Sequence, residues 1–164
     1  MIRPATREDM PRILELYTEA RAFMASHGNP PHWRDGYPEK QLEEDLRYGH
    51  LFVVIRDGII AGVFALSQGR ESSAYDRIQG SWRSEAPRGN LNRIAGAGPE
   101  KGISEEIFNW CKERHDHLRI DTHENNEVMR YLVLKHGFEL RGRIVYDDNS
   151  VSDGFDWLRE PEEE

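Results

Sequence analysis

The sequence predicts a single mixed α/β domain, and three observations support this. Segments with apolar residues at helical spacing alternate with short β-branched and aromatic runs, and an Asp-Gly pair joins two of those runs. The chain has 164 residues, 37% of them hydrophobic, which suffices for one core but not for two independent cores. We therefore expect one domain over residues 1–159, followed by an acidic tail at 160–164.

The first third of the chain is expected to hold a short strand and two helices. Thr6 and Asp9 have the spacing of a capping box, and apolar residues recur at helical spacing over 7–26. A second helix is expected to begin near Pro38 and to end before Gly49. The apolar stripe of the first helix consists of Met10, Ile13, Leu14, Tyr17, Ala20 and Met24.

A hairpin and a long loop are predicted next. Strands are expected at 50–55 and 59–66, because the Asp-Gly pair in residues 56–58 favours a tight turn between them. Residues 67–90 show little apolar periodicity and are expected to form one long loop. Loops of this length in a compact domain are usually functional or partly disordered.

The second half is predicted to run strand, helix, strand, helix and hairpin. Strands are expected at 91–95, 118–122, 138–146 and 155–158, with helices after 102 and after Asn126. A glycine-bearing turn at 96–102 precedes the first of these helices, and the exposed amides of a helix N-terminus can bind an anion. The same turn is also an ordinary tight connection, so by itself it leaves both interpretations open.

Composition excludes several classes of protein. The 22 basic and 30 acidic residues give a formal charge of −8, which argues against nucleic-acid binding and favours a cationic partner such as an amine. The single cysteine, Cys111, excludes an internal disulfide, fits a reducing compartment and is expected to be a buried core thiol. The sequence has no apolar run long enough to cross a membrane and no signal peptide, so we expect a cytoplasmic protein with no membrane partner.

A group of polar residues near the middle of the chain offers metal-type ligands. Its members are His115, Asp116, His117, Asp121 and His123. Their spacing matches no zinc motif, so we expect solvated polar residues and no metal.

Two segments resemble the signatures of GNAT-superfamily N-acetyltransferases. Residues 99–104 are similar to the pyrophosphate loop of that family, with matches at Gly102 and Ser104 and a departure at Pro99. Residues 126–138 are similar to a later signature, and the matching positions are Asn126, Leu132, Lys135, Gly137 and Phe138. The order of elements from Met1 to about Leu158 also agrees. The resemblance implies a central, mostly antiparallel twisted sheet, splayed between its fourth and fifth strands and flanked by about four helices.

The resemblance also implies a cosubstrate, acetyl-CoA, lying between the strands at 91–95 and 118–122. The cofactor-binding residues that it implies are Ile94, Ala95, Gly96, Lys101, Gly102, Ile103, Ser104, Asn126 and Lys135. The implied reaction is direct attack on the thioester by a primary amine of a small molecule or peptide, with an amide near Ala95 stabilising the oxyanion. Edge strands near the C-terminus are compatible with a homodimer.

Two departures from the family pattern keep a second function open. Glu105 and Glu106 stand in the first turn of a predicted helix, where carboxylates would repel a pyrophosphate. Val133 stands where many members have a tyrosine that protonates the leaving thiolate, although a thiol of reference pKa about 8.5 is a fair leaving group without one. The alternative is a non-catalytic module of the same fold that binds an acyl-CoA or a protein partner.

The attacking amine needs a group to take its proton, because alkyl amines have a reference pKa of about 10.4. By position, Glu71 is the first candidate base, unless it is simply a solvated loop carboxylate, and Tyr75, Asp76 and His123 follow it. Aromatic residues in predicted loops could wall an acceptor pocket or form a packed hydrophobic cover. These residues are Trp33, Tyr37 and Trp82.

Overall fold

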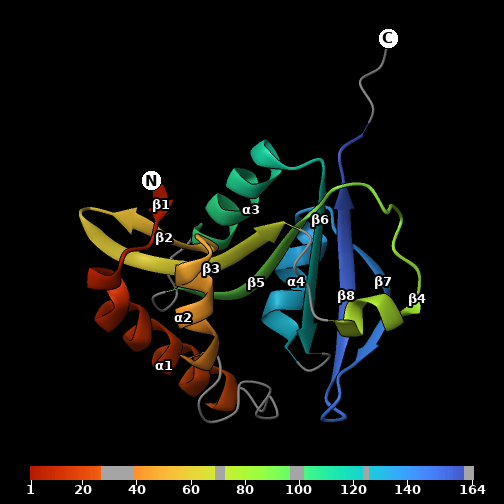
Figure 1. The fold of residues 1–164 in the computed structure, drawn as a ribbon, viewed down its shortest axis with the longest axis horizontal. Coiled ribbons are helices and arrows are strands. Elements are labelled where there is room, and N and C mark those ends of the chain that lie inside the picture. The colour runs from red at the N-terminus through yellow and green to blue at the C-terminus, as the bar shows by residue number, and fades with distance from the viewer. Residues whose placement is uncertain (27–38, 69–72, 97–101, 124–125, 161–164) are drawn as a thin grey trace. The chain divides into compact units, whose positions relative to one another are not determined.

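The computed structural model describes residues 1–26, 39–68, 73–96, 102–123 and 126–160 (Figure 1). This part of the chain contains four α-helices, eight strands and two short 3-10 helices, so the predicted mixed α/β class is confirmed. The chain forms two compact units. Unit 1 comprises Met1–Leu66 and Leu91–Ile107, and unit 2 comprises Ser67–Asn90 and Phe108–Glu164.

Unit 1 contains two helices, the start of a third and strands in the order β1-β2-β3-β5. Its elements are β1 (Ile2–Pro4), η1 (Arg7–Asp9), α1 (Met10–Ser26), α2 (Glu39–Arg47), β2 (Leu51–Arg56), β3 (Ile59–Gln68), β5 (Gly89–Gly96) and the first turn of α3 (Ile103–Arg114). β1 and β3 both pair antiparallel with β2. The β2–β3 turn has positive φ at Asp57 and Gly58, 52° and 75°, as expected for a tight Asp-Gly hairpin.

The core of unit 1 lies between α1, α2 and one face of its strands. It consists of Ile13, Leu16, Tyr17, Leu42, Leu51, Val53, Val63 and Ala95. Two details of the predicted α1 stripe are wrong: Leu14 is 39% exposed, whereas Leu16 is fully buried. Ile13, Leu16 and Tyr17 follow the i, i+3, i+4 spacing of one helix face, and Leu14 lies about 100° away from Ile13 around the axis.

Unit 2 contains strands in the order β6-β8-β7-β4, each antiparallel to its neighbour. Its elements are η2 (Ser73–Arg77), β4 (Gln79–Gly80), the rest of α3, β6 (His117–His123), α4 (Glu127–Lys135), β7 (Glu139–Val145) and β8 (Val151–Leu158). The predicted unbroken loop at 67–90 is therefore wrong, because this segment holds η2, β4 and one end each of β3 and β5. The predicted fourth and fifth strands are β5 and β6.

The two faces of the unit 2 strands are covered differently. On one face, the Arg130 guanidinium of α4 pairs with Asp153 and lies 5.7 Å from the centroid of the Phe155 ring. On the other face, Tyr75 and Ile144 form a small buried cluster with Ala74, and Ile78, Trp82 and Tyr146 pack against it. β8 begins four residues before its predicted start. The sequence pattern does not indicate this because Ser152 is polar, although the strand buries it completely.

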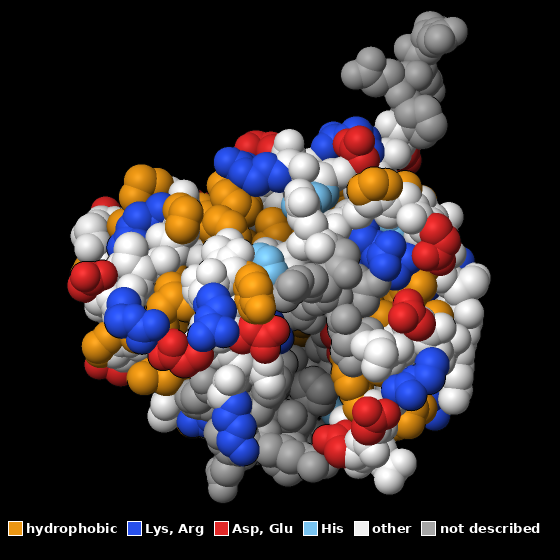
Figure 2. Space-filling view, in the orientation of Figure 1, with side chains coloured by type: hydrophobic (Ala, Val, Ile, Leu, Met, Phe, Trp, Pro, Cys, Tyr) orange, Lys and Arg blue, Asp and Glu red, His pale blue; other side chains and the backbone are white. Residues whose placement is uncertain are grey.

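The surface visible in Figure 2 carries basic and acidic side chains of the described residues side by side. On that face they do not gather into a broad patch of one sign, as a phosphate-binding surface for nucleic acid would require. Among the helices in the described ranges, none has the length and apolar character needed to cross a bilayer.

Candidate functional site

The N-terminus of α3, in unit 1, has the backbone features of an anion site. Gly102 precedes the helix with a φ of +90°, and the first helical hydrogen bond runs from the Glu106 amide to the Gly102 carbonyl, at 2.9 Å. The amides of Ile103, Ser104 and Glu105 therefore have no acceptor within the helix. Amides at such an end, together with the helix dipole, favour a bound phosphate.

Two glycines set this helix end against the strands of unit 1. A Cβ atom added at Gly62 of β3 would lie 2.8 Å from Cγ2 of Ile103, and one at Gly96 of β5 would lie 3.3 Å from it. Because neither glycine has a side chain, Ile103 packs against both strands, and only 4% of its surface is exposed. The predicted residues Gly96, Gly102, Ile103 and Ser104 are thus brought together.

Arg56, at the end of β2, places a cation beside this helix end. Its Nη2 atom lies 3.4 Å from where a Cβ atom of Gly102 would be, and donates to Glu106 Oε2 at 3.1 Å. The Met1 amino group donates to the other carboxylate oxygen of Glu106 at 2.9 Å. Burial alone would raise the pKa of Glu106, but these hydrogen bonds outweigh it and hold the pKa below its usual value.

The expected repulsion of a phosphate by Glu106 is therefore countered by charges within the site. Arg56 belongs to the β2–β3 hairpin, far from α3 in the chain, so no local pattern in the sequence connects it with Gly102. Glu105, the second carboxylate of this turn, is exposed.

β5 has an irregular backbone next to the predicted cofactor residues. Arg93 has a φ of +52°, which is unusual for a non-glycine residue, and its carbonyl accepts a hydrogen bond from the Tyr17 hydroxyl at 2.9 Å. Ala95 is buried in the core of unit 1, whereas Ile94 and Gly96 are half-buried. The role of these three residues toward a cofactor remains a prediction.

In unit 2, Asn126 joins the end of β6 to α4. Its side-chain Oδ1 accepts from the Met129 amide at 3.2 Å, and its own amide donates to the His123 carbonyl at 2.9 Å. The predicted helix cap is therefore confirmed. Lys135 lies in the last turn of α4, exposed, with Nζ 6.0 Å from the centroid of the Tyr131 ring. The binding roles of Asn126 and Lys135 remain predictions.

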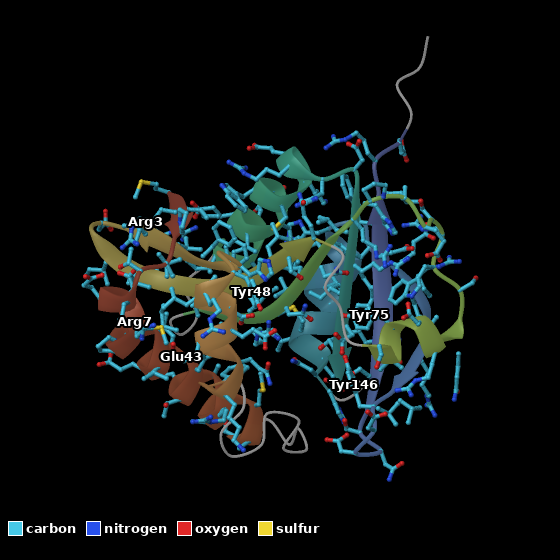
Figure 3. All side chains as sticks on the ribbon, viewed as in Figure 1. Arg3, Arg7, Glu43, Tyr48, Tyr75 and Tyr146 are labelled. Atoms are coloured by element: carbon cyan, nitrogen blue, oxygen red, sulfur yellow. The ribbon has the colours of Figure 1, made fainter. Side chains whose placement is uncertain are left out.

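Asp121 of β6 is the centre of a hydrogen-bonded cluster. The Tyr75 hydroxyl donates to its Oδ1 atom, and the Tyr146 hydroxyl donates to Oδ2 at 2.6 Å (Figure 3). Tyr75 is 1% exposed, so this candidate base has a buried hydroxyl that is already engaged. Trp82 donates from Nε1 to the Tyr75 carbonyl at 2.9 Å, with the two ring centroids 5.3 Å apart, as in a packed hydrophobic cover.

The predicted group of solvated polar residues is partly wrong. His117 is 1% exposed, with Nε2 3.5 Å from Oδ2 of the buried Asp156, and Asp121 is tied to two tyrosines. His123 lies two residues beyond Asp121 on the same face of β6 and is half-buried. In the strand register it stands opposite Ser152 of β8. Within the described ranges, no three His, Cys, Asp or Glu residues are grouped so that they could hold a metal ion.

Two further positions are buried in unit 2. Cys111 is completely buried, which confirms the expected core thiol. Val133 is also completely buried. Four predicted residues lie outside the described ranges, namely Trp33, Tyr37, Glu71 and Lys101.

Comparison with known proteins gives both sequence and structural relatives. No protein-family model matches the sequence. The chain is 25% identical over 142 residues to peptidyl-lysine N-acetyltransferase YiaC of Escherichia coli (strain K12). The aligned region covers 85% of this chain and 84% of that protein.

Among solved structures, an acetyltransferase of the GNAT family from Streptococcus agalactiae is similar with a TM-score of 0.89 and 29% identity, over 98% of this chain and 96% of that one. Naa50 of Arabidopsis thaliana, solved with the bisubstrate analogue CoA-Ac-MVNAL, is similar in fold, with a TM-score of 0.64 and 14% identity over 96% of this chain and 97% of that one. The resemblance inferred from the two sequence signatures is thus confirmed, and this chain has the fold of the GNAT-family acetyltransferases.

Proposed function

We propose that this chain is an acetyl-CoA-dependent N-acetyltransferase that acetylates a primary amine. The observation that carries the proposal is the α3 N-terminus, where Gly102 exposes backbone amides and Arg56 adds a cation. The fold and the 25% identity to a peptidyl-lysine N-acetyltransferase support acetyl transfer in general. The cosubstrate and the acceptor class go beyond those comparisons.

The chemistry of the α3 end fits the pyrophosphate of a coenzyme A thioester. The amides of Ile103, Ser104 and Glu105 would donate to its oxygens, and Arg56 would offset its negative charge. When bound, acetyl-CoA supplies the acetyl group as a thioester with a good leaving group. Gly102 and Ile103 fix the helix end, so its three amides are already placed to donate to an anion.

We propose that His123 is the base that accepts the proton of the attacking amine. Among the candidate bases in the described ranges, Tyr75 is buried with its hydroxyl bonded to Asp121. An imidazole nitrogen can accept a proton from the amine and pass it to water. His123 stands at the end of β6, half-buried, so water can reach that strand end.

The acceptor we propose is a cationic alkyl amine, such as a lysine side chain or a polyamine. The net charge of −8 favours the approach of a cation over that of an acidic substrate. The relative YiaC is named as a peptidyl-lysine enzyme, which is consistent with this class.

The first experiment is thermal unfolding of the full chain while acetyl-CoA is titrated to high excess. At about 100 times its dissociation constant a ligand adds roughly 2.7 kcal/mol to stability, so we expect a saturable rise of several degrees. Release of free thiol in the presence of a panel of amines then tests the transfer. Absence of both the rise and the thiol would refute the proposal.

Arg56→Gln provides the matched test of the anion site. We expect it to weaken acetyl-CoA binding about tenfold, because one charge-assisted contact to phosphate is lost. Arg7→Gln is the control, since Arg7 is an exposed arginine of the same unit that pairs with Glu43. Equal binding by both variants would contradict the assigned role of Arg56.

One observation favours the non-catalytic alternative. Val133, at the position where many family members carry a tyrosine acid, is completely buried and has no ionisable group. A module that only binds acyl-CoA would show the thermal rise with no thiol release from any amine. The thiol assay therefore separates the two functions.

A further inference from the structure

We infer that Asp121 is the residue that binds the acceptor amine, through a carboxylate held in place by Tyr75 and Tyr146. This inference deepens the proposed function and rests on it for the reaction, but the binding of an amine to Asp121 can be measured separately. It assigns the acceptor site to unit 2.

The geometry fixes the carboxylate in one orientation. Tyr75 comes from η2 and Tyr146 follows β7, so two separate elements each supply one hydroxyl, one to each carboxylate oxygen. Figure 3 labels both tyrosines, which lie beside β6 and β8. A carboxylate oxygen can accept two hydrogen bonds, so each oxygen of Asp121 keeps acceptor capacity for a ligand. Asp121 is half-buried, whereas Tyr75 beneath it is buried.

Asp121 differs from two buried aspartates in the partners of its carboxylate. Asp45 forms an ion pair with Arg93, and Asp156 forms one with Arg83. Over the described ranges, Asp121 forms no ion pair, and its partners are the two neutral phenols. A half-buried carboxylate with only hydroxyl partners is suited to a cation from outside the chain.

The surroundings of the carboxylate strengthen such an interaction. Gly154 of β8 pairs with Asp121, and a Cβ atom there would lie 2.9 Å from Cη2 of Trp82 and 3.0 Å from Cδ1 of Ile144. Apolar and aromatic side chains therefore fill the space next to the carboxylate. Low local polarity strengthens a charge-assisted hydrogen bond from an ammonium, and the faces of aromatic rings attract the same cation.

These features specify the class of amine. A carboxylate accepts hydrogen bonds from both an ammonium and a neutral amine, so Asp121 can hold the nitrogen before and after its proton leaves. A carboxylate next to the amine, as in a free α-amino acid, would be repelled by Asp121. The acceptor is therefore an alkyl amine without a neighbouring acid group, such as a lysine side chain.

The test is calorimetric titration of the full chain, with and without coenzyme A, using Nα-acetyl-lysine methylamide as the probe. Alanine and the analogue of the probe with a hydroxyl in place of the amine are the comparison ligands. We expect the lysine derivative to bind and both comparison ligands to bind at least tenfold more weakly. No binding of the lysine derivative under either condition, or equal binding of the hydroxyl analogue, overturns the inference.

Asp121→Asn should lower the affinity for the probe about 10- to 100-fold, because the charge-assisted hydrogen bond is lost. Tyr146→Phe keeps the ring and removes one hydroxyl, so it should lower the affinity for the probe about threefold to tenfold. This variant tests the inference even if Asp121→Asn does not fold. The control is Asp116→Asn, because Asp116 is 84% exposed in the same unit and pairs with Arg159. Unchanged probe affinity in Tyr146→Phe, or in a folded Asp121→Asn, overturns the inference.

The acetyl-CoA thermal rise and turnover, measured on the same variants, separate the inference from the proposed function. We expect Asp121→Asn to keep the acetyl-CoA rise and to raise KM for the amine more than it lowers kcat. If acetyl-CoA binds and turnover proceeds with an unchanged KM, the inference fails and the proposed function stands. If the probe binds through Asp121 but acetyl-CoA does not bind the wild type, the proposed function fails and the amine site stands.

Discussion

The Arg93 guanidinium donates to both carboxylate oxygens of Asp45, from Nε at 2.9 Å and from Nη2 at 2.8 Å. The two side chains are 17% and 8% exposed, so the ion pair is largely removed from water. It ties α2 to the one residue of β5 that has a positive φ. Together with the Tyr17 hydroxyl on the Arg93 carbonyl, it holds the irregular part of the strand from two helices.

Asp45→Asn is predicted to destabilise the protein by about 3 kcal/mol, because it leaves the Arg93 charge buried without its partner. Urea unfolding at neutral pH measures the change. Glu43→Gln is the control, since Glu43 lies in the same helix as Asp45 but forms an exposed ion pair with Arg7, so it should give no measurable change (Figure 3). Equal stability of the two variants would contradict the assigned importance of the Asp45 pair.

Gly102→Ala is predicted to lose stability and to bind acetyl-CoA more weakly. A side chain at a φ of +90° costs on the order of 1–2 kcal/mol, and the new Cβ atom would approach Nη2 of Arg56 to 3.4 Å. Gly49→Ala is the matched control, because Gly49 has a φ of +71° with no atom within 4 Å of the added Cβ. It should lose stability without any change in acetyl-CoA affinity, as measured by the thermal titration.

Asp9 gives a prediction for acid stability. The hydrogen bond from Arg3, with that from the Thr6 amide, outweighs burial and lowers the pKa of Asp9 to about 2. A carboxylate with a lowered pKa stabilises the fold above its unfolded value of 3.8, and this contribution is lost as the pH falls toward 2.

Asp9→Asn should therefore cost about 1–2 kcal/mol at pH 7, after allowance for solvent screening, and nothing below pH 2. Urea midpoints between pH 6 and pH 2 measure this convergence. A constant difference between variant and wild type across that range would show that the loss is not electrostatic.

Cys111 is predicted to be inert in the native state. Burial raises the pKa of its thiol to about 12, so almost no thiolate is present at pH 8. Ellman's reagent should react with one thiol per chain in denaturant and with none under native conditions. Rapid native labelling would mean that α3 opens locally, and it would also give a background in the thiol-release assay.

Local signals in the sequence predicted local structure well. The Asp-Gly hairpin, the Asn126 cap and the strands β5 to β7 depend on residues close together in the chain, so their patterns survive without tertiary information. η2 and β4 were missed because their packing depends on Ile144 and pairing with β7, far along the chain.

The candidate site divides in the same way. Gly102 carries its signal within a short motif, whereas the cation that completes the helix end comes from Arg56 in another hairpin. In the sequence, Asp121 stands out only as one of several possible metal ligands. Its two tyrosine partners come from η2 and from the end of β7, and no sequence spacing connects them.

The division of the chain into units has a practical consequence for dissecting the protein. Neither unit is a continuous stretch of sequence, since the chain passes between them after Leu66, Asn90 and Ile107. A fragment ending at Leu66 would lack Ala95 from the unit 1 core and Ile103 from its place on Gly62. Truncation therefore cannot separate the proposed phosphate site from the proposed amine site, and each role has to be tested by point substitution in the full chain.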